Sequence, residues 1–240
     1  MNYLDYLRTD KFPHFWCSGC GNGIVLCAIA RAFEELDLTL ENTVVVTGIG
    51  CWGKADDYVR TNSFHGTHGR ALAFATGIKL ANPSLNVVVL MGDGDGITIG
   101  GNHFIHAARR NVDVTAILVN NFNYGMTGGQ YSGTTPEERI TTTSRYGHIE
   151  EGFDICAVAK AAGARYVARA STENPQQLKN LIRDGIKKQG FACIEAISPC
   201  PTHFGRNNGM RSPAALMRWV NENSVTPAQA VAMSEEELAG

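Results

Sequence analysis

Two short apolar runs, together with the glycine-rich stretch between them, constrain the fold of this chain most strongly. The first run covers residues 87–90 and the second covers 114–119. Apolar runs bounded by glycine or polar residues predict strands that are buried on both faces of a parallel sheet. The interval holds one helix's worth of sequence, with its core at 102–110. The unit is therefore strand, turn, helix and parallel strand.

Oxygen-bearing side chains follow both of these strands. Asp93 stands in GDGDG just after the first run, and Asn121 follows 28 residues later as the second of two asparagines that end the second run. Open α/β sheets bind ligands at this edge. A carboxylate and an amide oxygen suit Mg²⁺, which holds its ligand oxygens at roughly 2.1 Å. Gly92, Gly94 and Gly96 let the backbone approach a phosphate, which the unpaired N–H groups of the next helix attract.

GDG followed at this spacing by a paired asparagine resembles the thiamine diphosphate (ThDP) motif. In that motif the aspartate and the asparagine hold Mg²⁺ against the diphosphate. The alternative is an ordinary turn between a strand and a helix, because glycine turns after strands are common. The presence of a predicted strand before each of the two polar residues favours the ThDP motif.

The composition predicts a globular α/β protein with a substantial core. The chain has 240 residues, of which 44% are hydrophobic and 18% charged. One domain over 1–240, a mostly parallel sheet with helices on both faces, accounts for it, with 201–240 as a C-terminal extension. A net charge of −2 gives no sign of nucleic-acid or membrane binding. No run approaches the ~20 residues of a membrane span, and the N-terminus lacks a signal-peptide pattern, so we expect a cytoplasmic protein.

Seven cysteines without a secretory signal indicate free thiols or a metal site rather than disulfides. Cys17 and Cys20 have Cys-x-x-Cys spacing, while Cys51 and Cys200 each follow a predicted strand at the same sheet edge as Asp93. Three interpretations compete. They are a thioredoxin-like redox pair, a structural zinc site and a [4Fe–4S] cluster. The adjacent ThDP motif favours the cluster, because a cluster passes single electrons.

Six segments together resemble the β subunit of 2-oxoacid:ferredoxin oxidoreductases. They are WCSGCGNG (16–23), GIGC (48–51), HGTHGRALAFATGIKLANP (65–83), GDGDG (92–96), NNFNYGMTGGQ (120–130) and SPC (198–200). They occur in the family's order and span most of the chain. The resemblance implies a ThDP diphosphate-binding (PP-type) module that carries an iron–sulfur site.

The resemblance also implies which residues bind each group. Cys17, Cys20, Cys51 and Cys200 would ligate the [4Fe–4S] cluster, and Mg²⁺ would be held by Asp93, Asn121 and the backbone carbonyl of Asn123. The residues against ThDP would be Ile49, Gly50, Cys51, Trp52, His68, Gly69, Arg70, Gly94, Asp95, Gly125 and Met126. Lys54 corresponds to a lysine that lies near the substrate carboxylate in members of the family.

The implied reaction is the coenzyme A-dependent oxidative decarboxylation of a 2-oxoacid, with electrons passed to ferredoxin. The stretches GTHGRALAFATG and YGMTGGQ favour 2-oxoglutarate, which would give succinyl-CoA. Some broad-specificity members have a lysine within the segment that here reads 126–129, where this chain has Gly128. Pyruvate and branched-chain oxoacids therefore stay open as alternatives, as does the physiological direction.

The resemblance implies a hetero-oligomer as well. ThDP enzymes carry the glutamate that activates the cofactor's pyrimidine on a separate module, and no residue here takes that role. We therefore expect an α subunit that supplies it. Two other hypotheses remain: a non-redox ThDP-dependent 2-oxoacid decarboxylase subunit with zinc or nothing at its cysteines, and a non-enzymatic α/β module that binds a phosphate ligand.

Overall fold

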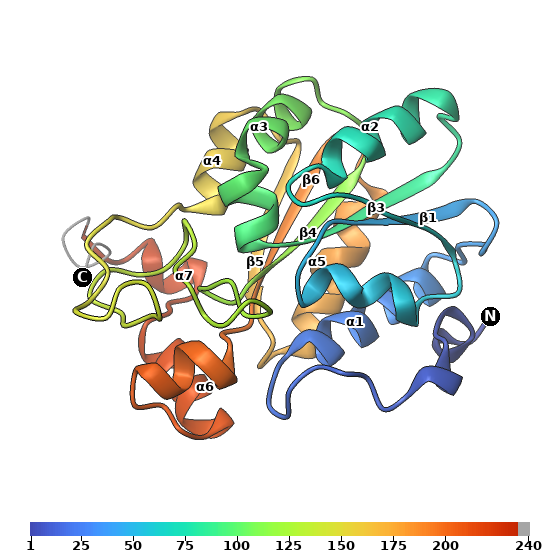
Figure 1. Cartoon of the computed structure of the whole chain (residues 1–240). Coiled ribbons are helices and arrows are strands. Elements are labelled where there is room, and N and C mark those ends of the chain that lie inside the picture. The colour runs from blue at the N-terminus through green and yellow to red at the C-terminus, as the bar shows by residue number, and fades with distance from the viewer. Residues whose placement is uncertain (235–240) are drawn as a thin grey trace.

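A single six-stranded sheet organises the chain (Figure 1). The computed structural model describes residues 1–234. All strand pairs are parallel, in the order β2-β1-β3-β4-β6-β5. The strands are β1 (Thr43–Thr47), β2 (Asn62–His65), β3 (Asn86–Gly92), β4 (Thr115–Asn120), β5 (Tyr166–Ser171) and β6 (Ala192–Ile197). The α/β fold class predicted from the sequence is confirmed.

Helices cover both faces of the sheet (Figure 1). The α-helices are α1 (Asn22–Glu35), α2 (Ala71–Ala81), α3 (Gly101–Arg109), α4 (Ile155–Ala161), α5 (Pro175–Lys187), α6 (Pro213–Glu222) and α7 (Pro227–Ala230). Short 3₁₀ or π segments are η1 (Tyr3–Tyr6), η2 (Thr9–Lys11), η3 (Trp52–Tyr58), η4 (Gly94–Ile99) and η5 (Pro201–Gly205). Helices α1 and α5 pack on one face, and α2, α3 and α4 pack on the other. Within residues 1–234, no helix has the length and hydrophobicity needed to span a bilayer.

The alternation of side chains along β3 shows why the strand is apolar throughout. Val88 and Leu90 belong to the core under α1 and α5, whereas Val87, Val89 and Met91 belong to the core under α2, α3 and α4. Successive side chains of a strand point to opposite faces, and both faces are covered here. The two hydrophobic cores therefore hold β3 and its C-terminal turn rigidly between them.

The edge strand β2 is not predicted from the sequence, whereas β3, α3 and β4 lie within two residues of the predicted ranges 87–90, 102–110 and 114–119. All four β2 residues are exposed, so the strand has no apolar pattern to reveal it. Its register comes from pairing with β1, where Val45 aligns with Ser63 and Thr47 with His65. The missed strand matters because it delivers residues 66–69 to the edge of the sheet where β1 and β3 also end.

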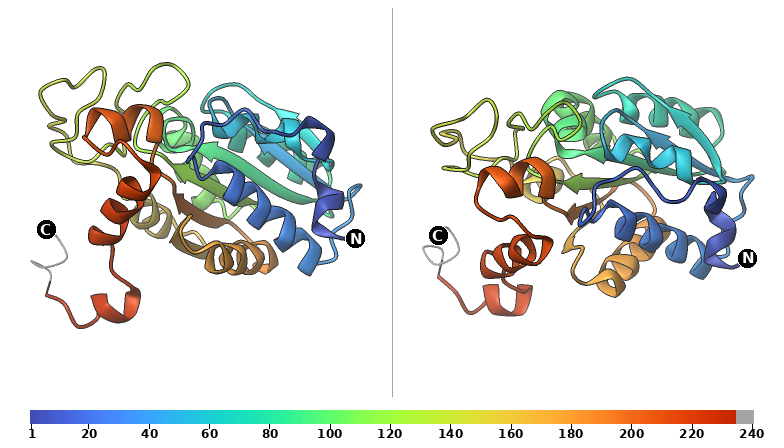
Figure 2. Two further views of the ribbon diagram at one scale, coloured as in Figure 1. Left: turned by 90° about the horizontal axis from the view of Figure 1, so that it is seen from below. Right: turned by 60° about the horizontal axis from the view of Figure 1, so that its bottom comes forward.

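The segment between β4 and α4 extends beyond the C-terminal ends of the strands, as Figure 2 shows in yellow-green. Part of the predicted C-terminal extension supports it. Phe122 lies directly after β4, and its ring contacts those of Phe204 in η5 and Trp219 in α6 at centroid distances of 5.2 and 5.8 Å. Leu216 and Val220 of α6 are buried. The last six residues of the extension, 235–240, lie outside the described residues.

Candidate cofactor and metal site

Asp93 is buried immediately after β3 and has its hydrogen-bond donors already in place. It is 1% exposed. Its Oδ2 accepts hydrogen bonds from the hydroxyls of Ser132 and Thr134, both at 2.6 Å, and Asn121 N lies 3.5 Å from Oδ1. Burial raises the pKa of Asp93, while the two hydroxyls act in the opposite direction. A buried carboxylate in this position would be stabilised strongly by a bound cation.

The turn after β4 directs two asparagines into the same region. Asn121 Oδ1 accepts a hydrogen bond from Asn123 N at 3.1 Å, and Phe122 between them has a φ of 63°. Asn123 is 2% exposed, yet neither its Oδ1 nor its Nδ2 has a hydrogen-bond partner among the described residues. Because an unpaired buried amide is costly, the site fits a ligand that would complete its hydrogen bonds. The donor set of Asp93, Asn121 and Asn123 is the oxygen chemistry that Mg²⁺ prefers.

Asp95 joins the three loops that follow β1, β2 and β3. Its Oδ1 accepts hydrogen bonds from Gly69 N at 2.7 Å, His68 Nδ1 at 2.7 Å and Ile49 N at 3.3 Å. Its Oδ2 lies against Gly48, where an added Cβ would stand 1.9 Å away. A glycine is therefore required at position 48 so that the Asp95 carboxylate can approach the backbone closely, and not because of its backbone conformation. The carboxylate fixes the relative positions of three chain segments around the cavity.

A cavity lies between these loops, and most of the predicted cofactor residues line it. The lining residues are Ile49, Gly50, Cys51, Trp52, His68, Gly92, Asp93, Gly94, Asp95, Asn121, Asn123, Tyr124, Gly125, Met126 and Thr127. All three predicted metal ligands are among them. Gly69 and Arg70 do not line the cavity: Gly69 acts through Asp95, and Arg70 begins α2, with Nη1 bonded to the Gly69 carbonyl at 3.3 Å.

Lys54 stands apart from the cavity. It belongs to η3, its side chain is 40% exposed, and its Nζ pairs with Asp57 at 2.7 Å. The Asp57 carboxylate raises the pKa of Lys54, so the ammonium stays charged. Contact with a substrate carboxylate would require Lys54 to exchange Asp57 for that carboxylate. Its proposed role stays a prediction.

Of the four predicted cluster cysteines, Cys51 lines this cavity and Cys200, from a separate segment, lies close to it. A Cβ built on Gly125 would lie 3.6 Å from both Cys51 Sγ and Cys200 Sγ, and 3.5 Å from Asn123 Oδ1. Burial raises the pKa of Cys20 to about 12 and that of Cys51 to about 11, and the charges of nearby cysteines add to both shifts. Cys17 is exposed. With these raised pKa values, Cys20 and Cys51 are neutral thiols near pH 7.

Several residues of this site were not predicted from the sequence. Ser132 and Thr134 are 39 and 41 residues from the aspartate that they hold, so no local pattern links them to it. Tyr124 and Thr127 line the cavity next to predicted residues. The sequence does contain one signal, a glycine- and threonine-rich stretch after the paired asparagines, which predicts a loop over the ligand edge but does not reveal which hydroxyls reach Asp93.

The chain is similar to several known proteins. Residues 47–196 match the family model "Thiamine pyrophosphate enzyme, C-terminal TPP binding domain". The chain is 52% identical to 2-oxoglutarate synthase subunit KorB of Methanothermobacter marburgensis over 238 residues, which cover 99% of this chain and 84% of the relative. It is 53% identical to the subunit of the same name from Methanocaldococcus jannaschii over 237 residues, or 99% and 88%.

A more distant relative and a solved structure agree with these matches. The β subunit of 2-oxoacid:ferredoxin oxidoreductase 2 from Aeropyrum pernix is 43% identical over 202 residues, 84% of this chain and 65% of the relative. The 2-oxoglutarate:ferredoxin oxidoreductase of Magnetococcus marinus, solved with 2-oxoglutarate, coenzyme A and succinyl-CoA, superposes with a TM-score of 0.81 at 40% identity, covering 84% of this chain and 69% of that one. The chain belongs to the family of ThDP-dependent 2-oxoacid:ferredoxin oxidoreductases, as a β subunit of the 2-oxoglutarate synthase type.

Proposed function

We propose that this chain is the ThDP-, Mg²⁺- and [4Fe–4S]-binding β subunit that oxidises 2-oxoglutarate to succinyl-CoA. In the proposed reaction, 2-oxoglutarate and coenzyme A give succinyl-CoA, CO₂, one proton and two electrons, which ferredoxin takes up one at a time. An α subunit supplies the pyrimidine-binding module. The oxoacid preference is supported by the relatives named 2-oxoglutarate synthase. The free cysteines suit a cytoplasmic location, where thiols stay reduced.

The carrying observation is that the side chain of Asn123, a residue of the proposed metal site, meets two of the proposed cluster cysteines at Gly125. An ideal Cβ built on Gly125 would lie 3.5 Å from Asn123 Oδ1 and 3.6 Å from both Cys51 Sγ and Cys200 Sγ. A decarboxylation that releases two electrons in single steps requires a one-electron carrier close to the reacting carbon. An oxygen site adjoining a sulfur site supplies that proximity within one chain.

The side chains of this subunit would bind and orient the cofactor. Asp93, Asn121 and the Asn123 carbonyl would hold Mg²⁺, and Gly94 leaves room for the Tyr124 ring, which a Cβ at that position would approach to 2.3 Å. When bound, ThDP supplies the electron sink for the loss of CO₂. Asp95 keeps His68 at the cavity wall, at an Nδ1–Oδ1 distance of 2.7 Å. Lys54 would exchange Asp57 for the substrate carboxylate.

In this structure the four cysteines do not form a closely spaced ligand set for a single zinc ion. Zinc with Zn–S bonds of about 2.3 Å brings its tetrahedral sulfurs to about 3.8 Å from one another. Within residues 1–234, the only group of three or more acidic, histidine or cysteine ligand atoms that all lie within 4.8 Å of one another is Asp154, Cys156 and Glu195. No three of the four predicted cluster sulfurs are that close. A four-iron cluster separates its ligands more widely than one ion does.

The test is a visible spectrum and an iron and sulfide assay of the α–β complex purified without oxygen. We expect a broad band near ~400 nm that dithionite bleaches, with about four irons per β chain. Addition of 2-oxoglutarate and coenzyme A should bleach the same band, whereas pyruvate should leave it. A colourless complex that contains zinc in place of iron would overturn the proposal.

A further inference from the structure

An ion pair between a buried carboxylate and a partly exposed arginine lies beside the predicted metal site, and the proposed reaction does not use it. Glu195 of β6 is 1% exposed. Its Oε2 accepts a hydrogen bond from Arg169 Nε of β5 at 2.7 Å, and its Oε1 accepts one from Asn120 Nδ2 at 2.8 Å. Burying the Glu195 carboxylate costs desolvation free energy that an apolar side chain would avoid. The position of Glu195, within β6 and next to β4, therefore calls for a reason.

Asn120 connects this ion pair to the metal site. Its Oδ1 accepts a hydrogen bond from Phe122 N at 3.2 Å, which shapes the turn that carries the two predicted asparagine ligands. The same Oδ1 lies 3.0 Å from the hydroxyl of Thr134, and that hydroxyl lies 2.6 Å from Asp93 Oδ2. Asn120 therefore reaches the predicted ligand Asp93 through Thr134, whose single hydroxyl proton can be donated to only one of the two oxygens at a time.

The carboxylate of Glu195 decides which way the Asn120 amide faces. An ionised carboxylate only accepts hydrogen bonds, so the Asn120 group that faces it must be the NH₂. The amide oxygen is then directed at Phe122 N and at Thr134. If the amide were reversed, its NH₂ would face the Phe122 N–H, and two donors would oppose each other.

We infer that Glu195, held by Arg169, is a positioning residue for the metal site and acts through Asn120. This inference rests on the proposed function, because it assigns Glu195 a role towards the Mg²⁺–diphosphate. Glu195 does not touch the metal ligands. It fixes the orientation of the Asn120 amide. That amide shapes the turn after β4 and contacts the Thr134 hydroxyl, which lies against Asp93. Outer-shell partners of this kind orient ligands and contribute to affinity.

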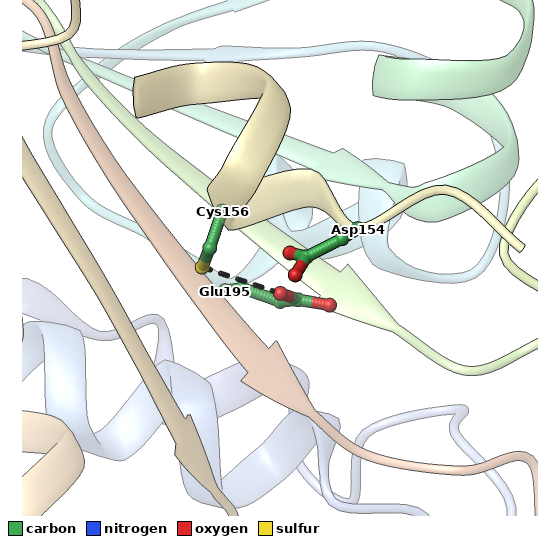
Figure 3. A group of neighbouring side chains, drawn as sticks. All are labelled: Asp154, Cys156 and Glu195. Atoms are coloured by element: carbon green, nitrogen blue, oxygen red, sulfur yellow. Dashed lines mark hydrogen bonds between the residues drawn. The ribbon is translucent and has the colours of Figure 1, made fainter. Parts of the chain in front are cut away.

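A different use of the same groups, a second metal site, does not fit. Figure 3 shows Asp154, Cys156 and Glu195 directed at one another, at a spacing typical of metal ligands. The guanidinium of Arg169 already lies 2.6 Å from Asp154 Oδ1 and 2.7 Å from Glu195 Oε2, so it occupies the place of a cation. Burial and the Glu195 carboxylate raise the pKa of Cys156 to about 12, so its neutral thiol faces Glu195 Oε2 at 3.4 Å.

The test is Glu195→Gln in the α–β complex, with Mn²⁺ as the probe metal and ThDP present. The glutamine has one oxygen for two donors, Arg169 and Asn120, and its NH₂ must face one of them. If it faces Asn120, that amide must reverse. We expect the Kd for Mn²⁺ to rise about 10–100-fold, the range for lost outer-shell partners. The Kd is measured from the electron paramagnetic resonance signal of free Mn²⁺.

A double variant restores the polarity of the hydrogen bonds. In Asn120→Asp with Glu195→Gln, the new carboxylate accepts from the glutamine NH₂ and from Phe122 N, while the glutamine oxygen accepts from Arg169. We expect the Kd of this variant to return most of the way to that of the wild type. The matched control is Glu35→Gln, which breaks another partly buried ion pair, with Lys179 and Arg183. It should lower the melting temperature without changing the Kd.

The outcomes separate the two proposals. A wild-type complex that does not bind Mn²⁺ with ThDP contradicts the proposed function itself. Wild-type binding together with an unchanged Kd in Glu195→Gln overturns only the role of Glu195, as does a double variant that binds as weakly as the single one. If Glu195→Gln does not fold, Asn120→Ser replaces it, because it leaves the ion pair intact. Weaker Mn²⁺ binding supports the inference, and unchanged binding overturns it.

Discussion

The oxygen ligands and the cysteines at this edge of the sheet are prepared for their ligands to different degrees. Asp93 and Asn123 are buried, and Asp93 already has two hydroxyl donors. Cys17, by contrast, is exposed, and burial keeps the pKa of Cys20 at about 12, so its thiol stays protonated. The oxygen site is built on strand ends that two cores hold in place, whereas the sulfur site is assembled from loops. Folding should therefore complete the first, and the bound cluster the second.

The largest expected effect is at Asp93. Asp93→Asn keeps the shape of the side chain and removes its charge, so the affinity for Mg²⁺–ThDP should fall by at least ~100-fold, beyond the range for outer-shell changes. The melting temperature of the metal-free complex should stay the same or rise, because an uncompensated buried carboxylate is removed. Titration calorimetry and a thermal scan measure the two quantities. A large loss of stability without metal would contradict the view that folding alone completes this site.

Cys17→Ser tests the independence of the sulfur site. Cys17 does not line the cavity, so we expect loss of the ~400 nm band and of the iron, with ThDP affinity changed only a few-fold. Iron analysis and ThDP titration on one anaerobic preparation of the complex would check both. If ThDP binding disappeared together with the iron, the two sites would form one cooperative unit and the contrast between them would be wrong.

Gly48→Ala should disturb the oxygen site by crowding Asp95. The new Cβ would stand 1.9 Å from Asp95 Oδ2, and the clash should lower the free energy of unfolding by about 1–3 kcal/mol. The control is Gly77→Ala in α2, where a Cβ meets nothing within 4 Å. This substitution in an exposed helical position should raise stability by up to about 1 kcal/mol. Urea denaturation compares them, and an equal response of the two variants would remove the packing argument for Gly48.

The smallest expected effect concerns pH and lies outside both sites. The hydrogen bond from Lys179 and the Arg183 guanidinium hold the pKa of Glu35 below its usual value of 4.5. Because the pKa is lower in the folded state, the ion pair stabilises the fold above pH 4.5 and loses its effect as pH falls through the lowered pKa. The melting temperatures of wild type and Glu35→Gln should therefore converge on acidification. A difference that stayed constant from pH 7 to pH 3 would exclude this contribution.

Sequence reasoning was most effective where chemistry is local. The apolar run before Asp93 predicted β3, and the glycines around it predicted the turn, because both depend on neighbouring residues. Ser132 could not be assigned to Asp93, since 39 residues separate them and only the folded loop brings them together. Glu195 was hidden for another reason. A single acidic residue in an apolar strand carries no pattern, and its partners Arg169 and Asn120 come from two other strands.

The uniform direction of the six strands gives the molecule two chemically unlike ends. Every proposed ligand lies at one end, while the turns at 39–42, 82–86 and 111–114 lie at the other. Ser84 in the second of these turns is exposed, and its backbone N–H donates to the nearby Asn82 side chain at 3.2 Å. A cysteine or an affinity peptide introduced there would tether the protein to an electrode with its cofactor edge directed away from the surface. Immobilisation chemistry can thus be chosen without engineering the catalytic end.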